Sequence, residues 1–271
     1  MAAPTGTVTP PAKRRPFLAF VTHQFRYELR IFFRNRQSVF FTMALPVMFL
    51  VILASVFGHL KVDVPGGTLS GSVYYVPGMI ALGVISASFG NLASSVISSR
   101  EAGILKRRRA TPVPAAALIA ARALVAVVIA LMITVVLLAI GYAYGASIPA
   151  RTAPAILLDV IVGALAFCGL GYALASVIHS VDATQPIVLA ITLPLYFISG
   201  VYVFASLLPH WLLNVAAVFP VRHFATALLA AYNPHATGSG IRRVDLVVMA
   251  GWGAFGLIVA VRRFSWLPHG N

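Results

Sequence analysis

Residues 98–114 read Ser-Ser-Arg-Glu-Ala-Gly-Ile-Leu-Lys-Arg-Arg-Arg-Ala-Thr-Pro-Val-Pro, a polar and strongly basic segment between two long apolar runs. The apolar runs cover residues 74–97 and 115–140, and each exceeds the roughly 20 residues that a helix needs to cross a bilayer. Basic residues concentrate in the cytoplasmic loops of membrane proteins. The pattern therefore predicts two membrane-spanning helices joined by a cytoplasmic loop.

The composition of the whole chain agrees with a membrane protein. Of its 271 residues, 60% are hydrophobic and only 10% are charged, whereas a soluble domain carries about 25% charged residues. We expect an all-α integral membrane domain over residues 17–263 with six transmembrane helices. The predicted spans are about 38–57, 73–98, 115–144, 154–178, 186–204 and 244–261.

The positions of the basic residues predict the topology. Lys and Arg number 20 and the net charge is +14; seven of these residues lie in 13–36, six in 100–122, and two are Arg262 and Arg263. If these 15 face the cytoplasm, the distribution follows the positive-inside rule and both termini are cytoplasmic. The positive charge then faces anionic lipid, and no nucleic-acid partner is expected.

Both ends of the chain are predicted to lie outside the membrane. Residues 1–16 are rich in Pro and Thr and read as a disordered cytoplasmic tail, and residues 264–271 form a second cytoplasmic tail. Between them, residues 17–36 have apolar and basic side chains recurring at helical spacing on different faces. We expect an amphipathic helix in the membrane interface, with Arg26, Arg30 and Arg34 toward lipid phosphates.

Two of the apolar regions carry unusual polar residues. The second half of the predicted span 73–98 is rich in Ser and Asn, which suits either close helix packing or the wall of a polar cavity. Arg122 lies near the cytoplasmic end of the next span, where its side chain is expected to snorkel to the interface.

Residues 205–241 are apolar but contain several prolines, which predicts a re-entrant hairpin dipping into the outer leaflet.

Catalytic chemistry is not visible in the sequence. It has no G-x-x-x-x-G-K-[ST] loop for ATP, no H-E-x-x-H and no C-x-x-C, and Cys168 is the single cysteine. The six acidic residues fall in predicted loops or near span ends, which argues against a proton-driven carrier. We therefore assign no catalytic residue and no metal ligand, and we expect no enzyme activity from the chain alone.

Three sequence motifs carry a family resemblance. The block from Arg100-Glu101 to Thr111-Pro112 resembles the loop after the second span of type-2 ABC exporter permeases, in particular drug-resistance permeases of the daunorubicin type. Tyr75-Val-Pro77-Gly78 resembles the start of the family's second span. The segment Leu208-Pro209 to Phe224 resembles the family's outer hairpin, which in this chain contains Pro209, Trp211, Pro220, Arg222 and His223.

The resemblance implies a mechanism. The loop would be a coupling helix that docks onto a separate P-loop ATPase subunit. The transporter would contain two copies of this ATPase, and they would bind ATP and Mg²⁺. The permease chain itself would bind no cofactor. A second permease copy or a paralogue would complete an alternating-access exporter in the bacterial inner membrane. The coupling residues implied are Arg100, Glu101, Gly103, Lys106, Arg107, Arg109, Thr111 and Pro112.

The cargo is predicted only as a class. Residues on the first, second and fifth spans could line a path along the dimer axis, and an aromatic and methionine lining favours hydrophobic drugs or lipid-like molecules. These residues are Phe40, Met43, Asn91, Ser95, Thr192, Tyr196 and Phe197. A lipid-linked glycan exporter, an ion-coupled carrier and a membrane-embedded enzyme acting on lipids remain as alternatives.

Overall fold

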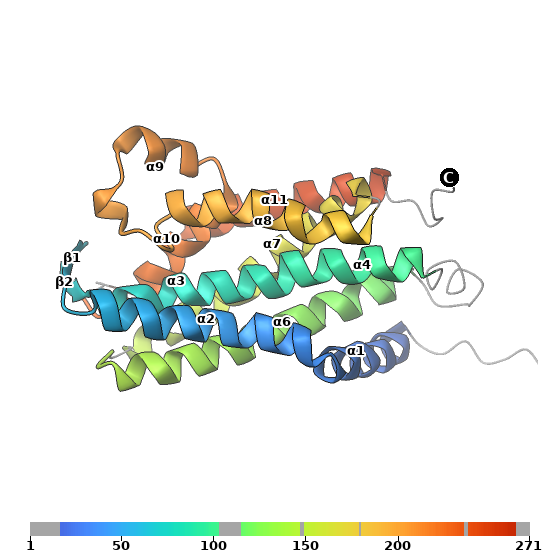
Figure 1. The fold of residues 1–271 in the computed structure, drawn as a ribbon, viewed down its shortest axis with the longest axis horizontal. Helices are drawn as coiled ribbons and strands as arrows, with labels where there is room; N and C mark the ends of the chain where they lie inside the picture. The colour runs from blue at the N-terminus through green and yellow to red at the C-terminus, as the bar shows by residue number, and fades with distance from the viewer. Residues whose placement is uncertain (1–16, 103–114, 147–148, 179, 236–237, 264–271) are drawn as a thin grey trace, which may run out of the picture.

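The computed structural model describes residues 17–102, 115–146, 149–178, 180–235 and 238–263, and Figure 1 shows them as a bundle of long helices. The helices are α1 (Phe17–Arg34), α2 (Arg36–Phe57), α3 (Gly71–Ile85), η1 (Ser86–Gly90), α4 (Asn91–Glu101), α6 (Ala115–Ala143), η2 (Ala150–Thr152), α7 (Ala153–Val177), α8 (Val181–Ile198), η3 (Ala205–Leu207), α9 (His210–Ala216), α10 (Pro220–Tyr232) and α11 (Arg243–Arg263).

The all-α membrane fold is confirmed. Within the described ranges, six helical segments are long and apolar enough to cross a membrane, or seven if α9 and α10 form one broken span. One of the six is the continuous segment α3–η1–α4, which runs over Gly71–Glu101. The predicted spans therefore correspond in order to α2, α3–α4, α6, α7, α8 and α11.

Both bounds of the fifth helix differ from the predicted span. The fifth span was expected over 186–204, but α8 runs over Val181–Ile198 and contains both Pro186 and Pro194. The helix begins earlier in the chain than predicted because Glu101 accepts a hydrogen bond from the backbone N–H of Val181 at 2.9 Å. This bond satisfies one of the N–H donors that have no partner within the first helical turn. The helix also ends earlier than predicted because Gly200 has φ +84°, a left-handed backbone conformation that glycine often adopts just after a helix ends.

The connection between α2 and α3 contains a short β-hairpin where the sequence suggested a loop. β1 (Lys61–Val64) and β2 (Gly67–Ser70) pair antiparallel, with Lys61 opposite Ser70. Gly66 makes the turn with φ +91°, which a residue with a side chain rarely adopts. The side-chain amide of Asn233 donates to the carbonyl of Pro65 at 2.9 Å and so ties the hairpin to the segment after α10.

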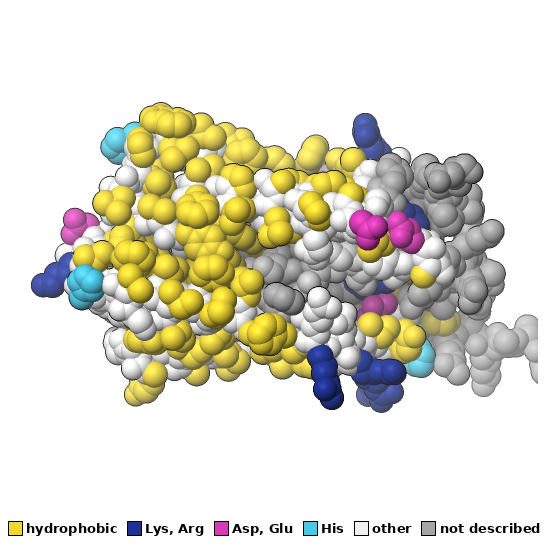
Figure 2. Space-filling model, viewed as in Figure 1, with side chains coloured by type: hydrophobic (Ala, Val, Ile, Leu, Met, Phe, Trp, Pro, Cys, Tyr) yellow, Lys and Arg dark blue, Asp and Glu magenta, His cyan; other side chains and the backbone are white. Residues whose placement is uncertain are grey.

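The bundle has two chemically different ends (Figure 1). We call the end with α1, the last turn of α4 and the last turn of α11 the basic end, because Arg26, Arg30, Arg34, Arg262 and Arg263 lie there. The opposite end, with β1, β2 and α9, is the hairpin end. Hydrophobic side chains cover much of the face between the two ends, as Figure 2 shows.

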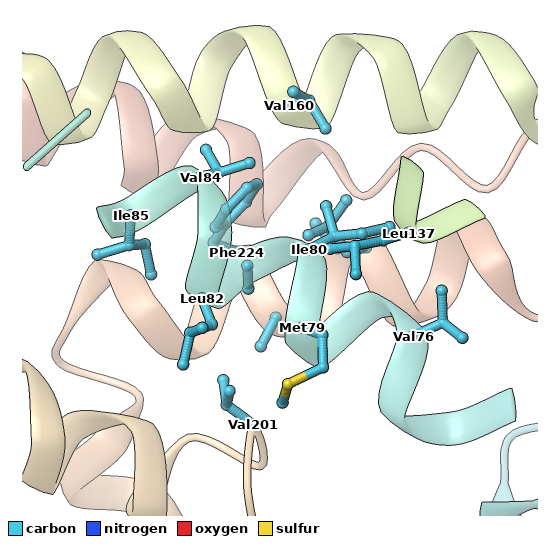
Figure 3. Packing of buried hydrophobic residues seen from close by; sticks show 14 of the residues in the cluster. Val76, Met79, Ile80, Leu82, Val84, Ile85, Leu137, Val160, Val201 and Phe224 are labelled. Atoms are coloured by element: carbon cyan, nitrogen blue, oxygen red, sulfur yellow. The ribbon is translucent and has the colours of Figure 1, made fainter. Parts of the chain in front are cut away.

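The core lies around the second span. Every residue of α3 is buried, and its side chains pack against α6, α7 and α10. Figure 3 shows Val84 of α3 close to Phe224 of α10, with Val160 of α7 on the far side of the cluster. In a soluble protein, transferring a large apolar side chain from water to the core stabilises the fold by about 1.5–3 kcal/mol. In a membrane the side chain would otherwise contact lipid, so tight van der Waals packing between the helices stabilises the bundle instead.

Helices α7 and α11 pack against each other at small residues. A Cβ atom added to Gly169 would lie 2.4 Å from the carbonyl oxygen of Gly253, and one added to Gly256 would lie 2.6 Å from the carbonyl carbon of Gly169. The two backbones are therefore in direct contact over this stretch. Small residues permit such an approach in membrane proteins, where van der Waals packing drives helix association.

A π-helical turn interrupts the second span at η1. This turn adds a residue to the helical repeat between α3 and α4, so the side chains after it are rotated relative to those before it. On the α3 side the chain is wholly buried, whereas several serines of α4 are partly or fully exposed. Within this polar stretch, Ser88 is buried, while Ser94 and Ser95 line a cavity.

Candidate functional site

The base of the basic loop is held inside the bundle. Arg100 is only 2% exposed, and its guanidinium donates to the carbonyl oxygens of Ala175, at 3.0 Å, and Ile178. These carbonyls belong to the last turn of α7 and its C-cap, where helices leave acceptors unpaired and a positive charge is favourable. Arg100 therefore fastens the end of α4 to the end of α7.

Glu101 makes the matching contact with the next helix. Its carboxylate accepts the backbone N–H of Val181, the first residue of α8, at 2.9 Å. A carboxylate at a helix N-terminus is stabilising because it faces unpaired N–H groups and the positive end of the helix dipole. Two consecutive residues thus bridge both sides of the turn between α7 and α8, and we call this pair of contacts the clamp.

The clamp gives the first two predicted coupling residues a structural position. Both residues fix the position of the C-terminal end of α4, where the loop begins. The buried side chain of Arg100 contacts α7 instead of pointing away from the bundle. The other coupling residues, Gly103, Lys106, Arg107, Arg109, Thr111 and Pro112, lie outside the described residues. Because of the clamp, a displacement of the loop would be passed directly to the ends of α7 and α8.

The predicted interfacial residues lie on the exposed side of α1. Arg26, Arg30 and Arg34 are exposed, while Val21 is buried and Phe25 packs toward the core. The opposite face of this helix contacts α6, and α1 also touches α2. The position of α1 in a membrane interface stays a prediction.

Arg122 does not snorkel to the interface as expected. It is 7% exposed, and its Nε lies 3.3 Å from a carboxylate oxygen of Glu28, which is 8% exposed. Gln24 also donates to Glu28 at 2.9 Å, and Nη2 of Arg122 donates to Ser99 at 3.0 Å. Removing two charges from water is costly unless they are paired and hydrogen-bonded, so Arg122 stays inside with Glu28 as its partner.

The predicted path residues lie on three neighbouring elements. α2 packs against α3, and α8 packs against α4, so these spans form one face of the bundle in Figure 1. Phe40 is 63% and Phe197 is 47% exposed, Ser95 is exposed, and Met43 is half-buried. These side chains are accessible from outside the protomer.

Other path residues are used within the protomer. Asn91 donates its side-chain amide to the hydroxyl of Thr42 and so links α4 to α2. Thr192 is buried and donates to the carbonyl of Val188 at 2.8 Å, and Tyr196 is also buried. Their place on a transport path stays a prediction.

The segment between α8 and α11 is sharply bent. α9 and α10 meet at an angle of 103°, which corresponds to a broken span or a re-entrant loop. Pro209 precedes α9, Trp211 is 66% exposed, and Pro220 is buried as the first residue of α10. Such a bend requires tertiary contacts, because backbone groups that leave the helix need partners in a membrane.

Polar contacts fix α10 against its neighbours. Arg222 donates to the carbonyl of Ser199 at 3.2 Å. The imidazole of His223 lies between two acceptors, with Nδ1 2.6 Å from a carboxylate oxygen of Asp245 and Nε2 2.8 Å from the carbonyl of Ala217. Asp245, at the start of α11, also pairs with Arg242. The two polar residues of the hairpin motif therefore anchor it to α8 and α11.

Comparison with known families identifies the architecture. A family model described as ABC-2 type transporter matches residues 21–233, from α1 to the residue after α10. The chain belongs to the ABC-2 type transporter family. No curated protein matches the sequence at a significant level.

Membership in the ABC-2 family defines the general activity. The chain is a multi-pass membrane protein and the permease subunit of an ABC transporter. In this family the transmembrane subunit is typically non-catalytic and works with a separate ATPase subunit. Among the described residues of this ABC-2 permease, no cluster of three or more His, Cys, Asp or Glu side chains could hold a metal ion.

Sequence reasoning missed two polar contacts in this permease. Glu28 and Arg122 are separated by 94 positions, so only an arginine inside an apolar run signalled that a partner was needed. Asp245 was noted only as an acid near a span end, and no local pattern connects it with His223. Both pairs arise from helix packing, which joins positions that have no periodic relation in the sequence.

Proposed function

We propose that this permease is the membrane subunit of an exporter that moves hydrophobic drugs or lipid-like molecules outward across a bacterial inner membrane. It resembles the drug-resistance branch of its family in the block from Arg100 to Pro112. The observation that carries the proposal is the clamp, because it connects this block mechanically to two membrane-spanning helices.

The energy would come from a partner. Two copies of a P-loop ATPase would bind ATP and Mg²⁺, and this chain would bind no cofactor. The cations Lys106, Arg107 and Arg109 would pair with acidic groups on that ATPase. Closure of the ATPases would move the loop and, through Arg100 and Glu101, the ends of α7 and α8. A second permease copy or a paralogue would move in the same way and produce alternating access.

The charge distribution supports this orientation. In the described part of the chain, the basic end carries Arg26, Arg30, Arg34, Arg262 and Arg263. Residues 106–109, outside the described ranges, add four basic residues to the sequence between α4 and α6. By the positive-inside rule this end faces the cytoplasm. Because the chain enters and leaves the bundle at this end, both termini would be cytoplasmic and the α9–α10 hairpin would face outward.

The exposed face of α2 and α8 supports an apolar cargo. Phe40 and Phe197 are exposed there, as are Met48 and Leu189. Aromatic and methionine side chains form adaptable apolar surfaces that accept ligands of varied shape. If a second permease copy faces this surface, the space between the copies would suit a hydrophobic molecule better than a hydrophilic one.

The first test is to identify the motor. The tagged chain is purified from its native host in mild detergent, and the proteins that accompany it are identified by mass spectrometry. We expect a stoichiometric P-loop ATPase that is lost when residues 100–112 are scrambled and kept when residues 2–12 are scrambled. Recovery of the chain without any ATPase, even after crosslinking, would contradict the coupling function.

The second test separates the exporter from its alternatives. The purified complex is reconstituted into vesicles, and transport of a fluorescent hydrophobic drug is measured with ATP and, separately, with an ion gradient. ATP-dependent transport that vanadate inhibits supports the proposal. Transport driven by the gradient without ATP would indicate an ion-coupled carrier. ATP-dependent transport of a lipid-linked glycan, with none of the drug, would assign the glycan as cargo.

A further inference from the structure

A cavity of about 510 Å³ lies near the basic end between α1, α4 and α6. Its lining also includes Ser38 of α2 and Gln185 of α8. Pockets that hold small organic ligands usually measure about 300–1,000 Å³, so this cavity has room for a lipid headgroup and the first part of an acyl chain.

The two walls of the cavity differ in chemistry. One wall is the hydroxyl-bearing side of α4, including Ser95, Ser98 and Ser99. The other wall is apolar and includes Phe32 of α1 and Ile129 of α6. A ligand that satisfies both walls must have a polar part and an apolar part. This requirement favours an amphiphile over a small hydrophilic ion.

A buried cation lies in the lining. Arg122 donates from Nε to Glu28 and from Nη2 to Ser99, and it is 7% exposed. A guanidinium carries five N–H donors, so it can serve an additional acceptor beside these two partners. Because Arg122 presents a planar set of donors, phosphate and carboxylate groups match it best.

The surrounding field favours an anion. In the described part of the chain, the basic end carries eight arginines against the three carboxylates Glu28, Glu101 and Asp182. Glu28 already pairs with Arg122 inside the lining, so an anionic ligand would not meet an unbalanced negative charge there. A cleft surrounded by one sign of charge raises the local concentration of ligands with the opposite sign.

We propose that this cavity binds an amphiphile with a phosphate headgroup from the membrane leaflet at the basic end. The phosphate contacts Arg122 and the serines of α4, and the acyl chain lies along Phe32 and Ile129. The site goes beyond the proposed transport function, because it can hold either a cargo molecule or a permanently bound lipid. Its test requires neither ATP nor transport.

The test is photolabelling of the purified transport complex. The complex is reconstituted in phosphatidylcholine vesicles that contain a small amount of photoactivatable phosphatidylglycerol, and labelled peptides are mapped by mass spectrometry. We expect saturable labelling of peptides from α4 and α6. Photoactivatable phosphatidylcholine, which carries no net charge, should label these peptides without saturation.

Two kinds of variant test the residues. Glu28→Gln combined with Arg122→Gln removes both charges, so no unpaired ion stays buried. Ser98→Phe fills the cavity without changing charge, and it tests the site even if the double variant does not fold. Each should weaken labelling by phosphatidylglycerol about tenfold: the double variant removes a charge-assisted hydrogen bond, and Ser98→Phe occupies the space of the ligand. Arg262→Gln and Ser206→Phe, exposed positions outside the cavity, are the controls and should have no effect.

The outcomes separate the ligand sources. Labelling that excess inorganic phosphate leaves unchanged supports an amphiphile, because the acyl chain then contributes to binding. Complete displacement by inorganic phosphate would overturn the amphiphile and indicate a site for free phosphate. Equal labelling by the two lipids, or labelling that neither the double variant nor Ser98→Phe reduces, would overturn the proposal entirely.

Discussion

Replacing Gly256 with alanine should destabilise the bundle at the contact between α7 and α11. A Cβ at this position would lie 2.6 Å from the carbonyl carbon of Gly169, 2.7 Å from its oxygen and 2.7 Å from the amide nitrogen of Leu170. All three atoms are backbone, so no side chain can rotate away to make room. The two helices would have to separate along this stretch.

The size of the effect follows from the geometry. Non-bonded carbon atoms are most stable at about 3.5–4.0 Å, so the helices must move apart by about 1 Å. Overpacking of this kind costs about 1–3 kcal/mol. The gain in helix propensity from glycine to alanine, up to about 1 kcal/mol, offsets part of that cost. We expect a net loss of about 1–2 kcal/mol in the free energy of unfolding.

Gly251 on the same helix provides a matched control. A Cβ there would meet nothing within 4 Å, so Gly251→Ala should gain helix propensity without any steric cost. It should leave the free energy of unfolding unchanged or raise it by up to about 1 kcal/mol. The free energies of unfolding of the two alanine variants should therefore differ by about 1–3 kcal/mol, with Gly251→Ala the more stable.

The assay is unfolding of the purified protein in mild detergent by titration with SDS, followed by circular dichroism. The free energy of unfolding is extrapolated to zero SDS for the wild type and the two variants. If Gly256→Ala is as stable as Gly251→Ala, the backbones of α7 and α11 are not in contact, and the reasoning is refuted. Gly256→Val should lower stability further, because its side chain is larger and β-branched.

Three further predictions concern the clamp, the loop and the hairpin. Arg100→Gln should lower ATP-driven transport at least tenfold at normal surface expression, because it removes charged hydrogen bonds worth about 1.5–3 kcal/mol each. Arg263→Gln, at an exposed position, is the control, and equal transport by the two variants would argue against the clamp. Lys106→Glu with Arg107→Glu should abolish substrate stimulation of ATP hydrolysis while membrane insertion stays intact, and unchanged stimulation would count against docking. Asp245→Asn should weaken the His223 contact and increase proteolysis between α9 and α10 several-fold, and identical digestion rates would contradict this anchoring.

Much of the architecture was predictable because the membrane imposes simple rules. An apolar run of about 20 residues has few stable alternatives to a spanning helix, so the order of the six spans follows from hydropathy. The start of α8 was missed because Asp182, Thr184 and Gln185 interrupt the apolar pattern there, and the carboxylate that caps the helix, Glu101, belongs to another helix. The β-hairpin at 61–70 was missed because its four-residue strands give little periodic signal.

The candidate site was predictable only in part. The basic block with Arg100 and Glu101 could be recognised as a coupling motif by resemblance, yet their hydrogen bonds to α7 and α8 could not be read from residue types. The cavity near Arg122 was also invisible, because it depends on how α1, α4 and α6 pack. A row of serines was visible, and it favoured helix packing over the lining of a cavity.

The amino-acid sequence by itself determined that the chain spans a membrane, in what order its helices follow, and which segment resembles a coupling loop. Hydrophobicity and charge are local properties of consecutive residues, and the bilayer acts on them directly. Tertiary structure alone decided that Arg122 pairs with Glu28, that Asp245 holds His223, and that α7 and α11 touch through glycines. These contacts join residues far apart in the chain, so they exist only once the helices have packed.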